Sequence, residues 1–553
     1  MMEYIFRGPT YRPFPYERRL AEHELEALTG SEADWRGEAL TLSVRKPLAA
    51  DLLRRLAFTS CVEAPSGSIP TQAHLLEQSA LHLRNGNGAR SLSDDGSSRK
   101  ESTYLTHGLH RYKGKFYPQL CRSLINIASI SPGDLVLDPF VGSGTTLVEC
   151  AISRIDSIGF DLNPLANLIA ATKVDLLQAR TENLAAALRR FEAALAEECQ
   201  DVGLAWVGPW WSEPEGDRGF PASVLAKECG LPQAGAEIQR WFPAAVCQKL
   251  VAILRATRRI EMPVFRRLTQ VCLSDQIRSV SQQEPRDLRI RRRAQEIEDA
   301  PLLSLLSEKL VKEMDKLKAG MAVLGAPVKV GVASAELRDA RTLDRDAHPI
   351  LYRRRVDAVV TSPPYANALP YIDTDRLSLL VLGLLSARER NQLQKEIIGN
   401  REIQDRERRA LEEEIEGERG IGTFPAAVAG QIRKVISQNR RHPVGFRRRN
   451  VPALLYQYFR DMRTVMDKLH AVVRPRGKAF LVLGDSTTQL GNGEELTIRT
   501  TEHLAALSEQ VGWCVADVWP ITVTIEDFAH VRNAITKNKI LVLNRGPAPK
   551  YAG

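Results

Sequence analysis

Apolar and polar positions follow a helical spacing in some parts of the chain and form short apolar runs in others. Between residues 134 and 161, an apolar run that ends in Asp138 leads through a glycine-rich turn into a helical stretch and a second apolar run that ends in Asp161. Strand, turn, helix and strand in this order make a βαβ unit. The pattern therefore predicts a parallel sheet with helices on its faces.

Further apolar runs predict more strands of the same sheet, at 328–332, 356–360, 478–483 and 540–543. Long amphipathic stretches separate these runs, so we predict one α/β sheet that two mainly helical insertions interrupt. The predicted units are an N-terminal domain over 1–84, a Gly/Ser-rich linker over 85–102, sheet segments over 103–175, 326–385 and 451–553, and insertions over 176–325 and 386–450.

Length and composition narrow the class of protein. A chain of 553 residues suits about three domains, or one large domain with insertions. The chain has 44% hydrophobic residues and eight cysteines, so collagen-like, disordered and disulfide-rich proteins are excluded. The cysteines form no C-x-x-C pair, so no metal site is expected. No apolar run approaches the roughly 20 residues of a membrane helix, and the start of the chain lacks a secretory signal. We expect a soluble cytoplasmic protein without a membrane partner.

Charge is concentrated in two arginine-rich runs, although the net charge is only +9. One run lies at 286–293 and the other at 440–449, where it surrounds Phe446. Guanidinium groups pair well with phosphate oxygens, so both runs are candidate nucleic-acid contacts, while a solvated surface remains the alternative for each. The candidate residues are Arg289, Arg291, Arg292, Arg440, Arg441, Arg447, Arg448 and Arg449.

The first candidate site is the glycine-rich loop after Asp138. In an open parallel sheet, ligands bind beyond the carboxyl ends of the strands. Gly142 and Gly144 permit backbone conformations that a Cβ forbids, and Asp161 is placed to accept hydrogen bonds from ribose hydroxyls. Neither a complete G-x-G-x-x-G motif nor a phosphate loop is present, so a nucleoside without pyrophosphate fits better than NAD or ATP. A structural turn is the alternative.

The second candidate site is Thr361-Ser362-Pro363-Pro364-Tyr365, directly after an apolar run. Two successive prolines make the loop rigid and remove two backbone donors. A hydroxyl, free carbonyls and an aromatic ring remain, and this set can hold a flat group that carries an NH2. A plain turn or a polyproline ligand is the alternative for this segment alone.

Together these segments resemble motifs I and IV of the S-adenosylmethionine-dependent amino-methyltransferases of DNA. The likeness extends over about 105–175 and 326–545, and the N-terminal hundred residues and both insertions have no counterpart. Shorter similar segments are Lys113–Pro118, Gly159–Ala166, Asp339–Arg341 and Pro475–Ser486.

The resemblance implies a Rossmann-like methyltransferase sheet and S-adenosyl-L-methionine as cofactor. By this resemblance, Phe116 and Pro118 flank the methionine end of the cofactor, Asp161 holds the ribose and Asp339 approaches the adenine amine. The implied cofactor residues are Phe116, Pro118, Asp138, Pro139, Phe140, Gly142, Gly144, Thr145, Asp161 and Asp339, and the implied catalytic residues are Ser362, Pro363, Pro364 and Tyr365.

The first residue of the catalytic motif separates the family's substrates. Ser362 favours the N4 amine of cytosine in duplex DNA, reached by base flipping, and adenine N6 is the alternative. No Pro-Cys pair is present to support methylation at cytosine carbon 5. Either insertion could contact DNA, with 176–325 preferred for target recognition. A cognate restriction endonuclease or other defence-system subunits are possible partners.

Two further hypotheses remain open at this point. An RNA methyltransferase that acts on a guanine N2 amine shares the same motif order. A non-catalytic DNA-binding subunit that retains the fold is the other alternative.

Overall fold

The computed structural model describes residues 1–85, 101–204, 206–207, 210–211, 219–285, 287, 290–325, 330–346, 348–366, 371–417, 420–522 and 537–546. The linker predicted at 85–102 lies almost entirely outside these residues. Within them, no helix is both long and apolar enough to cross a membrane. The same residues contain no group of three or more His, Cys, Asp or Glu side chains that could hold a metal ion.

The N-terminal part of the chain folds as an antiparallel sheet with helices against it. Its strand order is β2-β3-β1-β4-β5. Side chains alternate across each strand, so Tyr4 and Phe6 of β1 point into a buried cluster, while Glu3 and Arg7 lie at the surface. The elements are β1 (Met2–Arg7), α1 (Pro15–Thr29), β2 (Asp34–Arg36), β3 (Ala39–Val44), α2 (Ala50–Arg54), β4 (Cys61–Ala64), β5 (Gly67–Pro70) and α3 (Gln72–Asn85).

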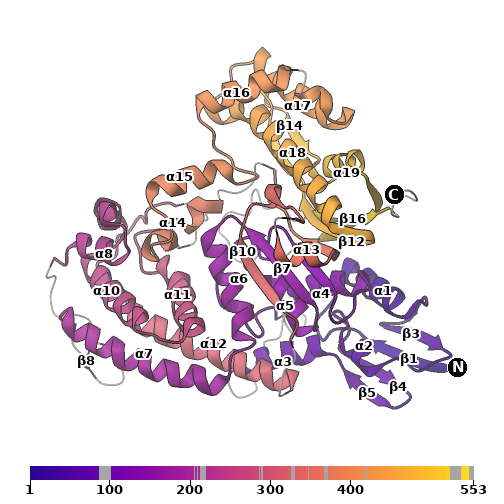
Figure 1. The fold of residues 1–553 in the computed structure, drawn as a ribbon, viewed down its shortest axis with the longest axis horizontal. Helices are drawn as coiled ribbons and strands as arrows, with labels where there is room; N and C mark the ends of the chain where they lie inside the picture. The colour runs from indigo at the N-terminus through magenta and orange to yellow at the C-terminus, as the bar shows by residue number, and fades with distance from the viewer. Residues whose placement is uncertain are drawn as a thin grey trace.

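A seven-stranded sheet forms the centre of the molecule (Figure 1), in the order β10-β7-β6-β11-β12-β16-β15. In order along the chain, these are strands three, two, one, four, five, seven and six. β16 runs antiparallel to both of its neighbours, and the other six strands run in one direction. The strands are β6 (Leu135–Asp138), β7 (Asp156–Asp161), β10 (Ala333–Leu337), β11 (Val356–Thr361), β12 (Val473–Gly484), β15 (Trp513–Thr522) and β16 (Lys537–Arg545).

This arrangement is the predicted Rossmann-like methyltransferase sheet. The strand order reverses between β6 and β11, which are parallel neighbours. Ligands of such sheets bind at this switch point, beyond the carboxyl ends of the two strands. Both candidate sites follow these two strands directly, so the fold brings them to the same edge of the sheet.

Helices cover both faces of the central sheet. The remaining elements of this region are α4 (Pro118–Ile127), α5 (Thr145–Ile152), α6 (Pro164–Leu176), the short helix η2 (Ala340–Thr342), α13 (Pro349–Arg353), α14 (Tyr371–Val381), β13 (Ser486–Gln489), β14 (Glu495–Ile498) and α19 (Thr500–Gln510). One face, through Val136, Val360 and Phe480, shares a buried cluster with α4 and the N-terminal α1. The N-terminal part is therefore packed onto the sheet through a common core. The other face packs against the long helix α18 (Phe446–Val472) and α19.

Two strand predictions need correction, and both concern edge strands. The strand expected at 328–332 is β10 at Ala333–Leu337, while 326–329 lie outside the described residues. The strand β15 at Trp513–Thr522 was not predicted at all. β10 and β15 end the sheet on opposite sides and are largely half-buried or exposed, so neither needs the continuous apolar run that marks a central strand.

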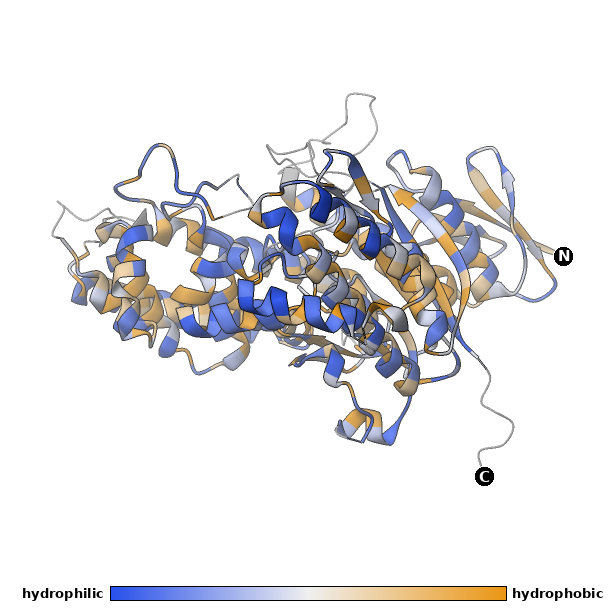
Figure 2. Cartoon of the chain, turned by 90° about the horizontal axis from the view of Figure 1, so that it is seen from above, coloured by the Kyte–Doolittle hydropathy of each residue, from blue (hydrophilic) through white to orange (hydrophobic). Residues whose placement is uncertain are grey.

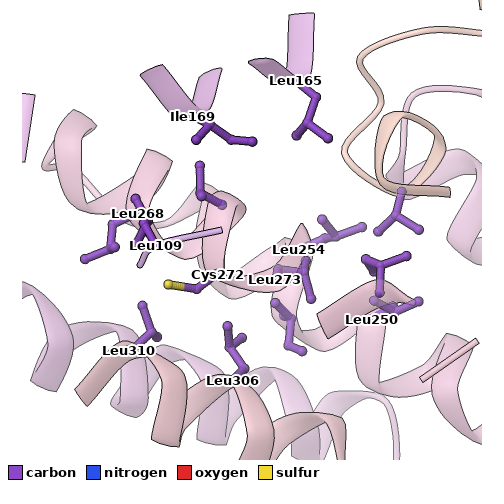
Figure 3. Packing of buried hydrophobic residues seen from close by; sticks show 14 of the residues in the cluster. Leu109, Leu165, Ile169, Leu250, Leu254, Leu268, Cys272, Leu273, Leu306 and Leu310 are labelled. Atoms are coloured by element: carbon purple, nitrogen blue, oxygen red, sulfur yellow. The ribbon is translucent and has the colours of Figure 1, made fainter. Parts of the chain in front are cut away.

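The first insertion is helical, as predicted, apart from the two-residue strands β8 (Trp206–Val207) and β9 (Trp210–Trp211). Its leucine-rich interior packs against α6, with Leu165 and Ile169 facing Leu268, Leu273 and their neighbours (Figure 3). The insertion is therefore continuous with the core of the sheet domain. Its helices are α7 (Thr181–Asp201), α8 (Ala222–Glu228), η1 (Pro232–Ala234), α9 (Gly235–Trp241), α10 (Ala244–Arg258), α11 (Pro263–Ile277) and α12 (Leu302–Leu324).

The second insertion consists of charged helices that lead into α18. These are α15 (Ala387–Glu396), α16 (Asp405–Glu416), η3 (Ile421–Thr423) and α17 (Ala426–Arg441). Hydrophilic and hydrophobic residues alternate along the helices of the molecule (Figure 2), as amphipathic packing requires. Helix α18 passes through residue 450 without a break, so the boundary expected there falls inside one element.

Candidate active site

Asp138 joins the two candidate loops. It ends β6, and its buried carboxylate accepts a hydrogen bond from Thr146 Oγ1 at 2.6 Å and another from Thr361 Oγ1 at 2.6 Å. Thr146 lies in the first turn of α5, whereas Thr361 is the last residue of β11 and directly precedes Ser362. One carboxylate therefore fixes the glycine-rich loop and the Ser-Pro-Pro-Tyr loop relative to each other.

The glycine-rich loop has the conformation that its glycines predict. Gly142 and Gly144 have φ of 48° and 81°, in the left-handed region. A Cβ on Gly144 would lie 2.8 Å from Cα of Ala170 in α6, so the loop also needs a glycine for close packing. Thr145, at the start of α5, has a buried hydroxyl without a hydrogen-bond partner among the described residues.

Asp161 ends β7 beside this loop. Its carboxylate accepts hydrogen bonds from the backbone N–H of Gly142 at 3.0 Å and of Asn163 at 2.8 Å. These bonds hold the carboxylate against the glycine-rich loop. The predicted ribose acceptor therefore lies at the carboxyl edge of the sheet, next to the strand that carries Asp138.

The segment before α4 lies over the same loop. The ring of Tyr112 approaches to 3.3 Å from the position that a Cβ on Gly142 would occupy. Phe116 is half-buried, and Pro118 is the first residue of α4. Tyr112, four residues before the predicted cofactor residue Phe116, thus brings the segment that leads into α4 to the glycine-rich loop.

The Ser-Pro-Pro-Tyr loop is held by three residues from other elements. The hydroxyl of Tyr458 in α18 donates to the carbonyl of Pro364 at 2.9 Å, and Ser486 Oγ donates to the carbonyl of Ala366 at 3.0 Å. Asn538 Nδ2 in β16 donates to the hydroxyl of Tyr365 at 2.7 Å.

Sequence reasoning did not find the roles of these three residues. Tyr458 occupies an ordinary apolar position of a helical pattern, and Asn538 lies at the edge of an apolar run. Neither position carries a local motif, since each acts only through the tertiary fold. Ser486 ends the segment Pro475–Ser486, which resembles the methyltransferase family, but nothing in that sequence indicated a contact with the catalytic loop.

Ser362 is half-buried, and its Oγ donates to the carbonyl of Val482 in β12 at 3.2 Å. The hydroxyl oxygen therefore keeps lone pairs that can accept a further hydrogen bond. Pro363 is buried and Pro364 is half-buried between Ser362 and Tyr365. The four predicted catalytic residues form one continuous loop at the end of β11.

Asp339 is engaged elsewhere. Its carboxylate pairs with Arg341 at 2.7 Å, and Arg341 also pairs with Asp461 of α18 at 2.8 Å. The sequence resemblance placed Asp339 near the adenine amine. In the structure it follows β10, beyond β7 and away from the β6–β11 junction, and its approach to a ligand stays a prediction.

Burial makes the carboxylates of the site unusually basic. It raises the pKa of Asp138 to about 6, against the hydrogen bonds from Thr146 and Thr361, and it raises the pKa of Asp161 to about 6. The pKa of Asp375 in α14, which accepts a hydrogen bond from Asn163, is also raised by burial to about 6. Nearby, burial lowers the pKa of Lys113 to about 7. Perturbed groups of this kind cluster at functional sites.

The arginine runs differ in how far they are neutralised. Arg291 pairs with Asp287 at 3.3 Å and Arg292 with Glu296 at 2.8 Å, while Arg289 lies outside the described residues.

In the second run, Arg440 pairs with Glu416 at 2.6 Å, and Arg448 donates to Gln489 of β13 at 2.6 Å. Arg441, Arg447 and Arg449 have no carboxylate within ion-pair distance among the described residues.

The residues at the β6–β11 junction fit S-adenosyl-L-methionine. The Thr145 hydroxyl, which has no hydrogen-bond partner among the described residues, and the Asp161 carboxylate beside the glycine-rich loop supply polar contacts for such a ligand. Glycine-rich loops and a distal acid are the elements that bind nucleosides in such sheets.

Comparison with known proteins finds similar methyltransferases over parts of the chain. Residues 87–171, which contain the glycine-rich loop and Asp161, match the family model described as DNA methylase. The type II methyltransferase M.MjaII of Methanocaldococcus jannaschii is 48% identical over 83 residues, which cover 15% of this chain and 16% of that protein. M.BsoBI of Geobacillus stearothermophilus is 25% identical over 297 residues, covering 53% of this chain and 55% of that protein.

A tRNA (guanine(10)-N2)-dimethyltransferase of Methanothermobacter thermautotrophicus is 35% identical over 52 residues, which cover 9% of this chain and 16% of that protein. The alignments thus span from about a sixth to about half of the length of these relatives. The sheet order, the joined loops and these matches relate the chain to the S-adenosyl-L-methionine-dependent amino-methyltransferases of DNA, without separating cytosine-N4 from adenine-N6 enzymes.

Proposed function

We propose that this chain transfers a methyl group from S-adenosyl-L-methionine to the exocyclic amine of a base in DNA. The observation that carries the proposal is the Asp138 carboxylate, which ties Thr361 and Thr146 together at 2.6 Å each. A ligand on the glycine-rich loop then faces a group held by the Ser-Pro-Pro-Tyr loop, since β6 and β11 are adjacent.

The residues of the second loop orient the amine. When bound, the cofactor supplies an electrophilic methyl group on its sulfonium sulfur. Ser362 Oγ and the carbonyl of Pro363 accept the hydrogens of the amine, because the carbonyl of Pro364 already accepts from Tyr458. The ring of Tyr365 stacks on the base. Such positioning and fixed acceptors favour transfer without a covalent enzyme intermediate.

Cytosine N4 is the proposed target amine, as Ser362 indicates, and a base in a duplex must be flipped out to reach the loop. The amine loses its proton as the new bond to the methyl carbon forms. Because Ser362 is a neutral hydroxyl and not a base, it orients the amine by accepting a hydrogen bond, and the released proton passes to solvent. Adenine N6 is the alternative product, and the fold and cofactor site would be the same for either.

The proposed DNA surface includes the start of α18. Phe446 is 55% exposed, and the cationic residues Arg441, Arg447 and Arg449 surround it in the sequence. Exposed guanidinium groups without carboxylate partners are suited to phosphates. The surface is connected to the catalytic loop, because α18 also carries Tyr458. We propose that Arg291 and Arg292 contribute more weakly to DNA binding, since both already form ion pairs. A cognate endonuclease or another defence-system subunit is the proposed protein partner.

Transfer of labelled methyl groups tests the proposal. Purified protein with S-adenosyl-L-methionine labelled in the methyl group is offered duplex DNA, tRNA or rRNA, and the product is digested to nucleosides. We expect label in DNA as N4-methylcytosine. Label only in N6-methyladenine would overturn the assignment of the base, and label only in RNA as N2-methylguanine would favour the activity named for the tRNA relative. A Tyr365→Ala variant, which should transfer little label, is the control for a contaminating enzyme.

A further inference from the structure

The Ser-Pro-Pro-Tyr loop depends on a residue from the last strand of the sheet. Asn538 lies in β16, more than 170 positions after Tyr365, and is only 5% exposed. Its Nδ2 donates to the Tyr365 hydroxyl at 2.7 Å. The register of the sheet sets this contact, because Asn538 pairs with Gly484 at the end of β12, next to β11.

Stability alone does not account for Asn538. Its Oδ1 is buried and has no hydrogen-bond partner among the described residues. An unpaired buried acceptor destabilises the folded protein, so an apolar residue would serve packing at least as well. The side-chain amide of Asn538 thus uses its Nδ2 group to hold the Tyr365 hydroxyl, while its Oδ1 stays unpaired among the described residues.

Tyr365 needs such support. Burial raises the pKa of Tyr365, and hydrogen bonds with Asn538 and Ser362 lower it. A ring that is attached to the backbone at one end and hydrogen-bonded through its hydroxyl at the other cannot swing about the Cα–Cβ bond. A stacking surface held at one position captures a base without first losing that freedom.

We propose that Asn538 is a positioning residue for the target base. It fixes the position of the Tyr365 ring through the hydroxyl, and it acts on the base only through that ring. The inference rests on the proposed function, because it assumes that Tyr365 stacks on a methylatable base.

A double-mutant cycle tests the inference in the full-length protein. The variants are Asn538→Ala, Tyr365→Phe and the double variant, and all are assayed for kcat and KM with duplex DNA and for cofactor affinity. We expect each single variant to raise KM for DNA by about threefold to tenfold, the worth of about one hydrogen bond. Because both remove the same bond, the double variant should be no worse than the more affected single variant. Cofactor affinity should stay unchanged.

A fluorescent base distinguishes a loss of base positioning from a general loss of folded, active protein. With 2-aminopurine at the target position, Asn538→Ala should reduce the fluorescence increase that accompanies extrusion of the base. Asn544→Ala is the matched control, since it removes the same side chain at the other end of β16 and should leave both readouts unchanged.

Multiplied losses in the double variant, or wild-type KM in Asn538→Ala, would overturn the inference. A wild-type protein that methylates no nucleic acid would instead contradict the proposed function itself.

Discussion

At the scale of single residues, the two halves of the site can be disabled separately. Asp161→Ala removes the proposed ribose acceptor and should weaken cofactor binding by at least about tenfold, since hydrogen bonds to a charged group contribute about 1.5–3 kcal/mol. Tyr365→Ala should leave cofactor binding close to wild type and weaken capture of the base. Calorimetric titration with S-adenosylhomocysteine and KM for DNA measure the two effects. Normal turnover in both variants would show that the residues are wrongly assigned.

The raised pKa of Asp161 predicts how cofactor binding depends on pH. An ionised carboxylate accepts hydrogens from two hydroxyls, and protonation below about pH 6 removes part of that capacity. The dissociation constant should therefore rise as the pH falls from 7 to 5, and it should vary less in Asp161→Asn.

The effect of Asp161 on folding has the opposite sign. Its folded pKa of about 6 exceeds the usual value of about 4, so its favourable contribution to stability is complete below pH 4 and is lost as the pH rises through 6. The stability of the wild type relative to Asp161→Asn should therefore fall as the pH rises through 6, and a relative stability that rose with pH would contradict this interpretation.

At the scale of elements, the pattern of apolar runs predicted the central strands of the sheet but not the correct positions of its edge strands. The strands β6, β7, β11, β12 and β16 are buried on both faces, so apolar runs mark them clearly. The edge strands β10 and β15 have one neighbour each and carry mixed sequences, which explains why one was misplaced and the other missed. The motifs located both loops, whereas Tyr458 and Asn538 act across the fold and have no local signal.

The contact between α5 and α6 gives a test at this scale. Gly144→Ala would place a Cβ 2.8 Å from the backbone of Ala170 and force φ of 81° on an alanine. We expect a loss of about 2 kcal/mol in the free energy of unfolding and weaker cofactor binding. Gly430→Ala is the control, because that glycine lies in α17 with no atom within 4 Å of the new Cβ and should be neutral or stabilising. Equal thermal midpoints of the two variants would refute the steric argument.

At the scale of the whole molecule, the two insertions differ in their relation to the sheet. The first shares a leucine-rich core with α6, and Glu237 of α9 pairs with Arg376 of α14 at 2.6 Å. The second presents Phe446, Arg447 and Arg449 at the start of α18, the helix that also supports the catalytic loop, and Arg441 at the end of α17. The sequence indicated two insertions but could not tell which presents unpaired charge, because ion pairing depends on the tertiary structure.

Salt dependence tests the DNA surface. Each phosphate contact contributes about −0.9 to the slope of log K against log salt concentration. The double variant Arg447→Ala/Arg449→Ala should therefore bind DNA more weakly and with a slope shallower by about 2. The control is Arg36→Ala/Arg54→Ala, which removes two exposed arginines from the N-terminal domain. An unchanged slope in the first variant would exclude this surface from the interface.

In the proposed enzyme, a cofactor methyl group on the glycine-rich loop meets a base amine on the Ser-Pro-Pro-Tyr loop. This meeting is tested by sequencing that detects modified bases, in the genome of a host that lacks N4-methylcytosine and expresses this chain. We expect N4-methylcytosine within a defined sequence context for the wild type, and none for Tyr365→Ala. A genome without any new methylated base, despite folded protein that binds the cofactor, would contradict it.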